Sequence, residues 1–194
     1  VSSYKIKAGG VAFLNAIPEM TSNITPSGVA SATPGDSSAF YAFNHTTGGF
    51  AWNPSSEAPG WIQYRYASAK TIVVYAMTAH VSALAANSMP KDFTFSGSNN
   101  GTSWTQLDSR TGIIWSAGQR QEFSTTSSGS YLYYRLNISA LQVSTNFILL
   151  PEFEMSEASG IFFPPTQFKL QGSTNGSSWV DLDSRSGLSW SPGE

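Results

Sequence analysis

The sequence contains no cysteine among its 194 residues. This absence excludes a disulfide framework, a thiolate nucleophile and any zinc or iron–sulfur site built on cysteine. Charge is also scarce, because only 11% of the residues are charged and the net charge is −2. Without an excess of positive charge the chain has no electrostatic basis for binding nucleic acid, so we predict no nucleic-acid partner.

Long hydrophobic runs are missing as well. No apolar stretch approaches the roughly 18 residues that a membrane-spanning helix needs, so we predict no transmembrane segment. The opening residues, VSSYKIKAGG, contain no hydrophobic stretch of the signal-peptide type. Because the first residue is Val1, a removed leader or an upstream segment stays open.

Aromatic residues are abundant at 13%, and the apolar pattern has a period of two, which is typical of strands. Turn signals rich in Gly, Pro, Asn and Ser separate these segments. The spacing predicts an all-β sandwich or barrel, with one possible helical turn at 81–87. The segments with the clearest strand pattern are WIQYRY (61–66), TIVVYAM (71–77), FTFSGS (93–98) and YLYYRLNIS (131–139).

An internal repeat links residues 93–119 to residues 168–194. Without gaps, 15 of the 27 aligned positions are identical, so duplication explains the match better than chance. An Asn-Gly pair in each copy predicts a tight hairpin turn. We expect the following pairs, and Trp61 of the first strand pattern, to fill the interior: Phe93 and Phe168, Trp104 and Trp179, Leu107 and Leu182.

The offset of 75 residues between the copies predicts that the second one is incomplete. We divide the chain into a linker or edge segment (1–10), a full domain (11–157) and a partial second repeat (158–194). A short hairpin segment cannot bury a core alone. It therefore continues beyond Glu194, packs on another chain or adds strands to the first sandwich, and we favour the first of these, with the segment docked to protect its edges.

The stretch from Met20 to Glu154 resembles the coagulation factor five/eight type C domain, also called the discoidin domain, which is related to the family 32 carbohydrate-binding modules. The opening of this stretch is most similar to copies in bacteriophage tail and virion proteins. The segments that carry the resemblance, in the order of the family, are MTSNITPSGVASAT (20–33), AFN with a following Trp (42–44 and 52), WIQYRYASAKTI (61–72), MPKDFTFSGSNNGTSWTQLDSRTG (89–112), YYRLNI (133–138) and LLPEFEM (149–155).

This resemblance implies an antiparallel jelly-roll β-sandwich of the galactose-binding-domain-like class, with a ligand site on loops at one end. A sugar site needs an aromatic face for the ring and amide or charged groups for the hydroxyls. Where the family often has an Arg before an Asn in the second loop, this sequence has His80 instead. The candidate ligand contacts in the three corresponding loops are His45 and Trp52, His80 and Asn87, and Asn146 and Phe147.

The resemblance also implies a structural calcium ion. Calcium prefers six to eight hard oxygen ligands, at least some of them anionic. The matching positions are the Phe43 carbonyl, Asn44, Thr47 and Glu152, and Asn44 stands where the family has Asp. One negative charge is therefore missing, and the alternative is that hydrogen bonds from Asn44 close the loop without an ion.

Two pairs of charged residues are interpreted as structural and not as catalytic. Glu152 and Glu154 lie about 6.6 Å apart on one face of a strand, a separation between the two glycosidase geometries. Neighbours on one strand lack opposed placement around a bond, so we predict no enzyme activity. Asp108 and Arg110, which recur as Asp183 and Arg185, are expected to fix a turn.

Three functions stay open at this stage. The first is a non-catalytic glycan-binding module of a larger surface-recognition protein, such as a phage tail or other virion component, at an extracellular or virion surface. Its partners would be cell-surface glycans or other virion chains, in an oligomeric assembly that supplies avidity. The second is a structural assembly domain without sugar binding. The third is phospholipid binding, for which Leu84 offers an apolar tip but no basic neighbour.

Overall fold

The computed structural model describes residues 3–8, 15–143, 147–157, 167–174, 178 and 180–186. The chain divides into two compact units. We call Phe13–Ala158 the complete unit, and we call Val1–Ala12 together with Ser159–Glu194 the terminal unit.

One sheet of the complete unit has five strands, and all its neighbours are antiparallel. Strand β8 lies at its centre, so residues of β8 pair with β3 on one side and with β5 on the other. In spatial order the strands are β2 (Val29–Thr33), β3 (Gly60–Lys70), β8 (Tyr131–Leu141), β5 (Pro90–Ser98) and β6 (Thr105–Arg110).

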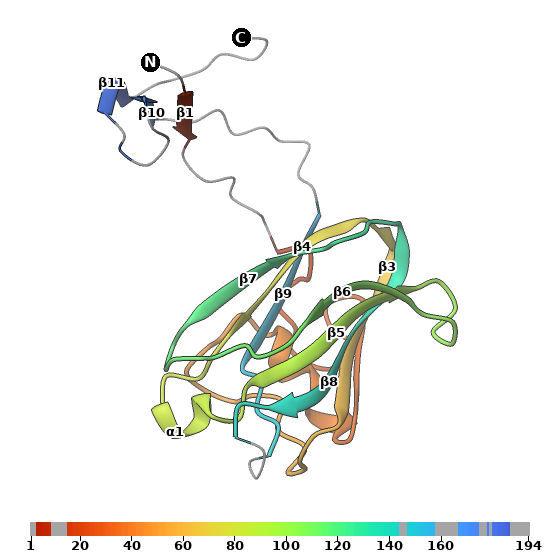
Figure 1. Cartoon of the computed structure of the whole chain (residues 1–194). Coiled ribbons are helices and arrows are strands. Elements are labelled where there is room, and N and C mark those ends of the chain that lie inside the picture. The colour runs from red at the N-terminus through yellow and green to blue at the C-terminus, as the bar shows by residue number, and fades with distance from the viewer. Residues whose placement is uncertain are drawn as a thin grey trace. The chain divides into compact units, whose positions relative to one another are not determined.

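The second sheet has three antiparallel strands, β7 (Arg120–Ser124), β4 (Ile72–Thr78) and β9 (Glu152–Glu157). The two sheets form two layers with the hydrophobic core between them (Figure 1). The predicted antiparallel β-sandwich is therefore confirmed.

Alternation along the strands builds this core. On β3, Ile62, Tyr64 and Tyr66 are buried, while the residues between them face outward. Aromatic rings then connect the two layers: the Tyr75 ring of β4 stacks on Phe95 of β5, with their centroids 4.4 Å apart. Such contacts stabilise the sandwich beyond the area that they bury.

Two tryptophans expected in the core lie elsewhere. Phe93 and Leu107 are buried as predicted, but Trp61 and Trp104 are only half-buried. Both rings stack on the guanidinium of Arg135, which belongs to the outward-facing set of β8. The prediction was wrong for these two residues because ring size was given more weight than the alternation of the strand.

The repeated Asp–Arg pair was also misassigned, because in the complete unit it does not fix a turn. Asp108 is 1% exposed on β6, and its Oδ2 accepts hydrogen bonds from the Tyr75 hydroxyl (2.7 Å) and from Arg110 Nε (2.7 Å). Since Tyr75 belongs to the opposite sheet, the pair ties the two layers together. Burial and the Asp108 charge both raise the pKa of Tyr75.

Among the described residues, short helices occur in the connections of the complete unit. A 3-10 helix, η1 (Asp36–Phe43), precedes β3, and a single helical turn, α1 (Ala83–Ala86), lies where the sequence predicted one. No helix among the described residues has the length and apolar character to cross a membrane.

The terminal unit contains one three-stranded antiparallel sheet in the order β1 (Ser3–Ala8), β10 (Gln167–Ser173) and β11 (Val180–Ser186). The first residues of the chain thus form an edge strand on the partial repeat. On β11, Val180 and Leu182 are 66% and 49% exposed. Trp179 lies outside the described residues.

Candidate functional site

Three loops of the complete unit meet at one end of the sandwich, and backbone hydrogen bonds join them. The Ile148 N–H donates to the Ser56 carbonyl (2.8 Å), and the Val143 N–H donates to the Asn87 carbonyl (3.0 Å). These bonds connect the segment after β8 to the loop before β3 and to the α1 loop. We call this region the loop end; it holds the three loops that were predicted to carry ligand contacts.

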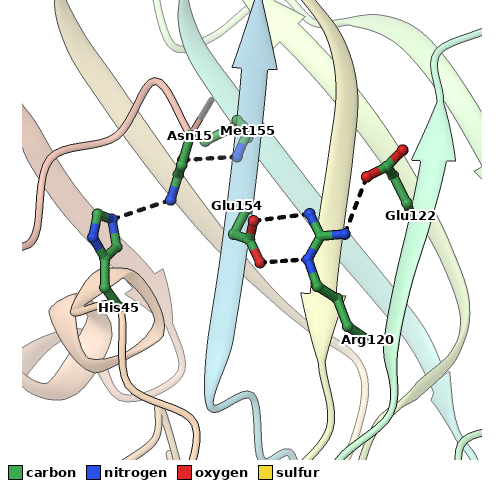
Figure 2. Close-up of polar contacts among 6 residues, drawn as sticks. All are labelled: Asn15, His45, Arg120, Glu122, Glu154 and Met155. Carbon is green, nitrogen blue, oxygen red and sulfur yellow. Dashed lines mark hydrogen bonds and ion pairs between the residues drawn. The ribbon is translucent and has the colours of Figure 1, made fainter. Parts of the chain in front are cut away.

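His45 holds the first of these loops to the N-terminal stretch of the complete unit. It has a positive φ of 57°, and its Nε2 lies 3.1 Å from the Asn15 amide nitrogen and 3.1 Å from the Ile17 carbonyl oxygen. Asn15 in turn accepts a hydrogen bond from the Met155 N–H on β9 (Figure 2). One imidazole nitrogen of this exposed residue is therefore engaged inside the protein.

Trp52 is buried and therefore cannot contact a ligand, contrary to the prediction. Its side chain is 0% exposed, and its backbone exchanges two 3.0 Å hydrogen bonds with Leu150. Its indole nitrogen is buried without a hydrogen-bond partner. The ring belongs to the hydrophobic core and offers no open face to a sugar.

His80 and Asn87 are half-buried at opposite ends of the α1 loop. His80 Nδ1 accepts a hydrogen bond from the Ser82 N–H (3.0 Å), which leaves Nε2 for another partner. Asn87 Oδ1 accepts from Gln142 Nε2 (3.1 Å), which leaves the Asn87 amide N–H groups as donors. Each side chain is thus fixed at one end and has hydrogen-bonding capacity at the other.

The third loop contributes Phe147, which is 52% exposed beside the buried Ile148. Its partner in the prediction, Asn146, lies outside the described residues. Phe50 was not among the predicted contacts, but it is 72% exposed and stacks on Tyr41 with 5.0 Å between the ring centroids. An aromatic residue directly after Gly48 and Gly49 in a polar loop was the signal that could have found it.

Glu152 is the most perturbed acid among the described residues. Its side chain is 3% exposed at the start of β9, and neither carboxylate oxygen has a hydrogen bond of normal geometry. Burial, and to a smaller extent the charge of Glu154, raises its pKa from 4.5 to about 9. The backbone N–H groups of His45 and Thr46 act in the opposite direction, which places the loop after η1 next to this carboxylate.

The predicted calcium ligands can be tested against this carboxylate. No cluster of three or more His, Asp or Glu side chains occurs in the described ranges, so any metal ion here would rely on neutral oxygens besides Glu152. The Asn44 Oδ1 accepts hydrogen bonds from the N–H (3.0 Å) and hydroxyl (2.7 Å) of Thr46, while Thr47 is exposed. The Phe43 carbonyl accepts from the Met20 N–H (2.9 Å).

Calcium stays a prediction at these residues, because Glu152 is their one acid and the Phe43 and Asn44 oxygens already accept hydrogen bonds. A buried carboxylate without a hydrogen bond of normal geometry is a costly arrangement that either a proton or a cation relieves. Glu152 would supply the anionic ligand, and Phe43 and Asn44 the neutral oxygens, beside the loop that the ion would fix.

Glu154, the second acid of the pair, is held by an arginine. Arg120 on β7 donates from Nε and Nη2 to the two Glu154 oxygens, each at 2.9 Å, and from Nη1 to Glu122 at 3.0 Å (Figure 2). These acids raise the pKa of Arg120. Glu152 is buried and Glu154 is paired, so the two do not form the opposed, accessible pair that glycoside hydrolysis needs.

Comparisons with known proteins identify the fold but not a sequence family. No protein-family model matches the chain, and no curated protein matches it in sequence. Among solved structures, CpGH89CBM32-5 from Clostridium perfringens, in complex with GalNAc-β-1,3-galactose, is 14% identical with a TM-score of 0.56. The match covers 70% of this chain and 99% of that one.

Two further structures match in the same way. The family 32 module of Clostridium perfringens NanJ, in complex with galactose, is 17% identical with a TM-score of 0.55, over 71% of this chain and 98% of that one. The family 32 module of Streptococcus pneumoniae EndoD is 17% identical with a TM-score of 0.56, over 70% and 99%. The chain therefore contains the fold of the family 32 carbohydrate-binding modules.

Proposed function

We propose that the complete unit is a non-catalytic glycan-binding module whose ligand sits at the loop end. The observation that supports this most directly is the convergence of three loops that present the exposed Phe147 near the half-buried Asn87. An aromatic ring faces the apolar side of a sugar, and an anchored amide donates to its hydroxyls. The fold, shared with modules that were solved with galactose and GalNAc-β-1,3-galactose, supports the same ligand class.

A calcium ion is part of this proposal. It would bind Glu152, the Phe43 carbonyl and Asn44, and its chemistry there is structural, since it would hold the loop after η1 to β9. Neutralising Glu152 in this way removes the cost of a buried, unpartnered carboxylate.

The larger context that we propose is a surface-recognition protein, such as a phage tail or other virion component, at an extracellular or virion surface. A shallow site of this kind binds one sugar weakly, so several copies in an oligomeric assembly would supply avidity.

An assembly domain that contacts other protein chains is the second candidate. One observation favours it, namely that Val180 and Leu182 on β11 expose apolar side chains within the terminal unit. The first proposal predicts sugar binding by the loop end, and the second predicts none.

A glycan array probed with the whole chain separates the two candidates. We expect binding to galactose- or N-acetylgalactosamine-containing glycans, and we expect Phe147→Ala to weaken it about tenfold by removing an aromatic contact. Ile114→Ala is the matched control, because Ile114 is a still more exposed apolar residue (75%, against 52% for Phe147) on another loop. Absence of binding to every glycan, or equal losses in both variants, would reject the glycan-binding proposal.

A further inference from the structure

The outer face of the five-stranded sheet carries a groove that the loop-end site does not use. It has a volume of about 350 Å³, which lies within the range of small-molecule sites. Direct cross-strand pairing places Trp61 of β3 opposite Asn137 of β8, and Asn137 opposite Thr94 of β5. The residues that line the groove are Thr33, Pro59, Trp61, Thr94, Asn137 and Ser139, with Gly60 and Ile138.

The aromatic wall of this groove is held in place. The Arg135 guanidinium carbon lies 4.0 Å from the ring centroid of Trp61 and 4.0 Å from that of Trp104, so the cation is stacked between two indoles. Arg135 Nε and Nη2 also donate to Gln63 Oε1, at 3.0 and 2.7 Å. The Trp61 ring is therefore pre-positioned, which lowers the entropy cost of binding against it.

The polar groups of the groove have unused hydrogen-bonding capacity. Asn137 Nδ2 donates to Thr94 Oγ1 (3.2 Å), which leaves Asn137 Oδ1 as an acceptor and the Thr94 hydroxyl proton as a donor. Ser139 Oγ donates to the Asp92 carbonyl (3.0 Å) and keeps acceptor capacity. None of the lining residues, all in the described part of the chain, is charged.

The floor of the groove depends on a glycine. A Cβ on Gly60 would lie 2.6 Å from Ile148 Cδ1 and 3.1 Å from the Thr33 carbonyl oxygen, so a side chain there would displace its neighbours. Because Ile148 is buried in the core, this contact lies behind the groove, on the inner side of the sheet.

We propose that this groove is a second subsite, which binds a neutral pyranose ring against Trp61. An indole wall, an amide oxygen and a hydroxyl donor, without any charge, match the apolar face and the hydroxyls of such a ring and give no counter-charge to an anion. The proposal takes its ligand class from the proposed function but uses residues of the sheet face alone.

The test is an NMR titration of the whole chain with galactose, GalNAc-β-1,3-galactose and chitotriose. We expect at least one sugar to shift the Trp61 indole N–H signal and the backbone signals of Thr94 and Asn137. Trp61→Ala is expected to weaken binding at this subsite about tenfold. Thr94→Val, which keeps the shape of a half-buried side chain, is expected to weaken it about threefold by removing one hydroxyl.

Trp104→Ala is the matched control, because Trp104 stacks on the same Arg135 but does not line the groove. It should leave the affinity within about twofold of the original. Equal losses in Trp61→Ala and Trp104→Ala, or no shift at Trp61, Thr94 and Asn137 with any of the three sugars, would overturn the proposal. Phe147→Ala separates the two sites, because it should leave the Trp61, Thr94 and Asn137 shifts intact whether or not the loop end binds sugar.

Discussion

Two sheets of this protein share one pairing scheme but differ in what covers them. In the complete unit, β8 pairs with β5 and β5 pairs with β6; in the terminal unit, β1 pairs with β10 and β10 pairs with β11. At the repeat offset of 75 residues, β1 has the same register on β10 as β8 has on β5. The matching pairs are Tyr134–Gly97 and Tyr4–Gly172, Arg135–Ser96 and Lys5–Gln171, and Leu136–Phe95 and Ile6–Leu170.

The difference lies in the opposing layer. In the complete unit, β4 packs on the sheet, so that Leu107 is 0% exposed and Asp108 bonds to Tyr75. Within the described part of the terminal unit no strand takes the place of β4, and Leu182, the counterpart of Leu107, is 49% exposed. Cross-strand pairing alone therefore reproduces the register, whereas burial of the same residue needs a second sheet.

The largest effect is expected from truncating the matched leucines. Leu107→Ala should lower the free energy of unfolding of the complete unit by about 3 kcal/mol, because it leaves a cavity in a packed core. Leu182→Ala should cost less than about 1 kcal/mol, since half of the side chain already contacts water. Urea unfolding of the whole chain, followed by tryptophan fluorescence, measures both changes.

One result would contradict this contrast between the covered sheet and the uncovered sheet. If Leu182→Ala destabilises as much as Leu107→Ala, and more strongly at high protein concentration, another copy of the chain covers the terminal sheet. Val180→Ala, which truncates a 66% exposed neighbour on β11, serves as the control for a change that is merely local.

An intermediate effect is expected from Glu152, which belongs to the complete unit alone. Burial raises its pKa from 4.5 to about 9, so the folded protein binds a proton that the unfolded chain releases above pH 4.5. The free energy of unfolding should therefore fall as the pH rises from about 5 towards 9. In chelator, Glu152→Gln should remove this slope and gain roughly 2 kcal/mol at pH 8.

With calcium, the unmodified protein should instead be more stable than Glu152→Gln at pH 8. Because the proposed ion would bind the ionised carboxylate, saturating CaCl2 is expected to raise the melting temperature of the unmodified protein at pH 8 and to leave Glu152→Gln unchanged. Identical melting curves with CaCl2 and with chelator would reject the calcium proposal, while the pH slope would still test the burial of Glu152.

The smallest global effect is expected from β1. Ile6→Pro removes the N–H of a residue inside the ladder with β10, so amide hydrogens of 167–173 should exchange faster by hydrogen-exchange mass spectrometry. The exchange of 90–98, the matching strand of the complete unit, should not change. Ser3→Pro is the control, because proline is tolerated at the first residue of a strand. Unchanged exchange in 167–173 after Ile6→Pro would contradict the pairing of β1.

The sequence was sufficient for the features that depend on local alternation. The strands around Trp61, Phe95 and Tyr134 were found because apolar and polar residues alternate there, and the strand around Val74 because it is rich in β-branched and aromatic residues. The same alternation grouped Trp61 with Gln63 and Arg65, and hence with the outer face, but a large ring was assumed to be buried. For Trp61, the two-residue period of the strand predicted the outward-facing position better than the hydrophobicity of the side chain did.

Features that depend on distant partners could not be predicted in this way. The register of β1 on β10 joins residues 160 to 170 positions apart, although the likeness of Tyr4-Lys5-Ile6 to Tyr134-Arg135-Leu136 was a usable signal. The burial of Glu152 results from packing by the loop that carries His45 and Thr46, which no pattern within β9 encodes. At the loop end the sequence located the loops but could not separate the buried Trp52 from the exposed Phe50.

The ladder between β1 and β10 has a mechanical consequence. Ser3 pairs with Ser173 and Ala8 pairs with Phe168. The chain therefore leaves this ladder towards the complete unit and returns from it at the same end of the ladder. Tension applied to Ser3 and Ser173 acts at the opposite end and opens the rungs one after another. Under such a pull, the residues between Ala8 and Phe168 would bear tension only after the last rung had parted, so the ladder would protect the sandwich from stretching.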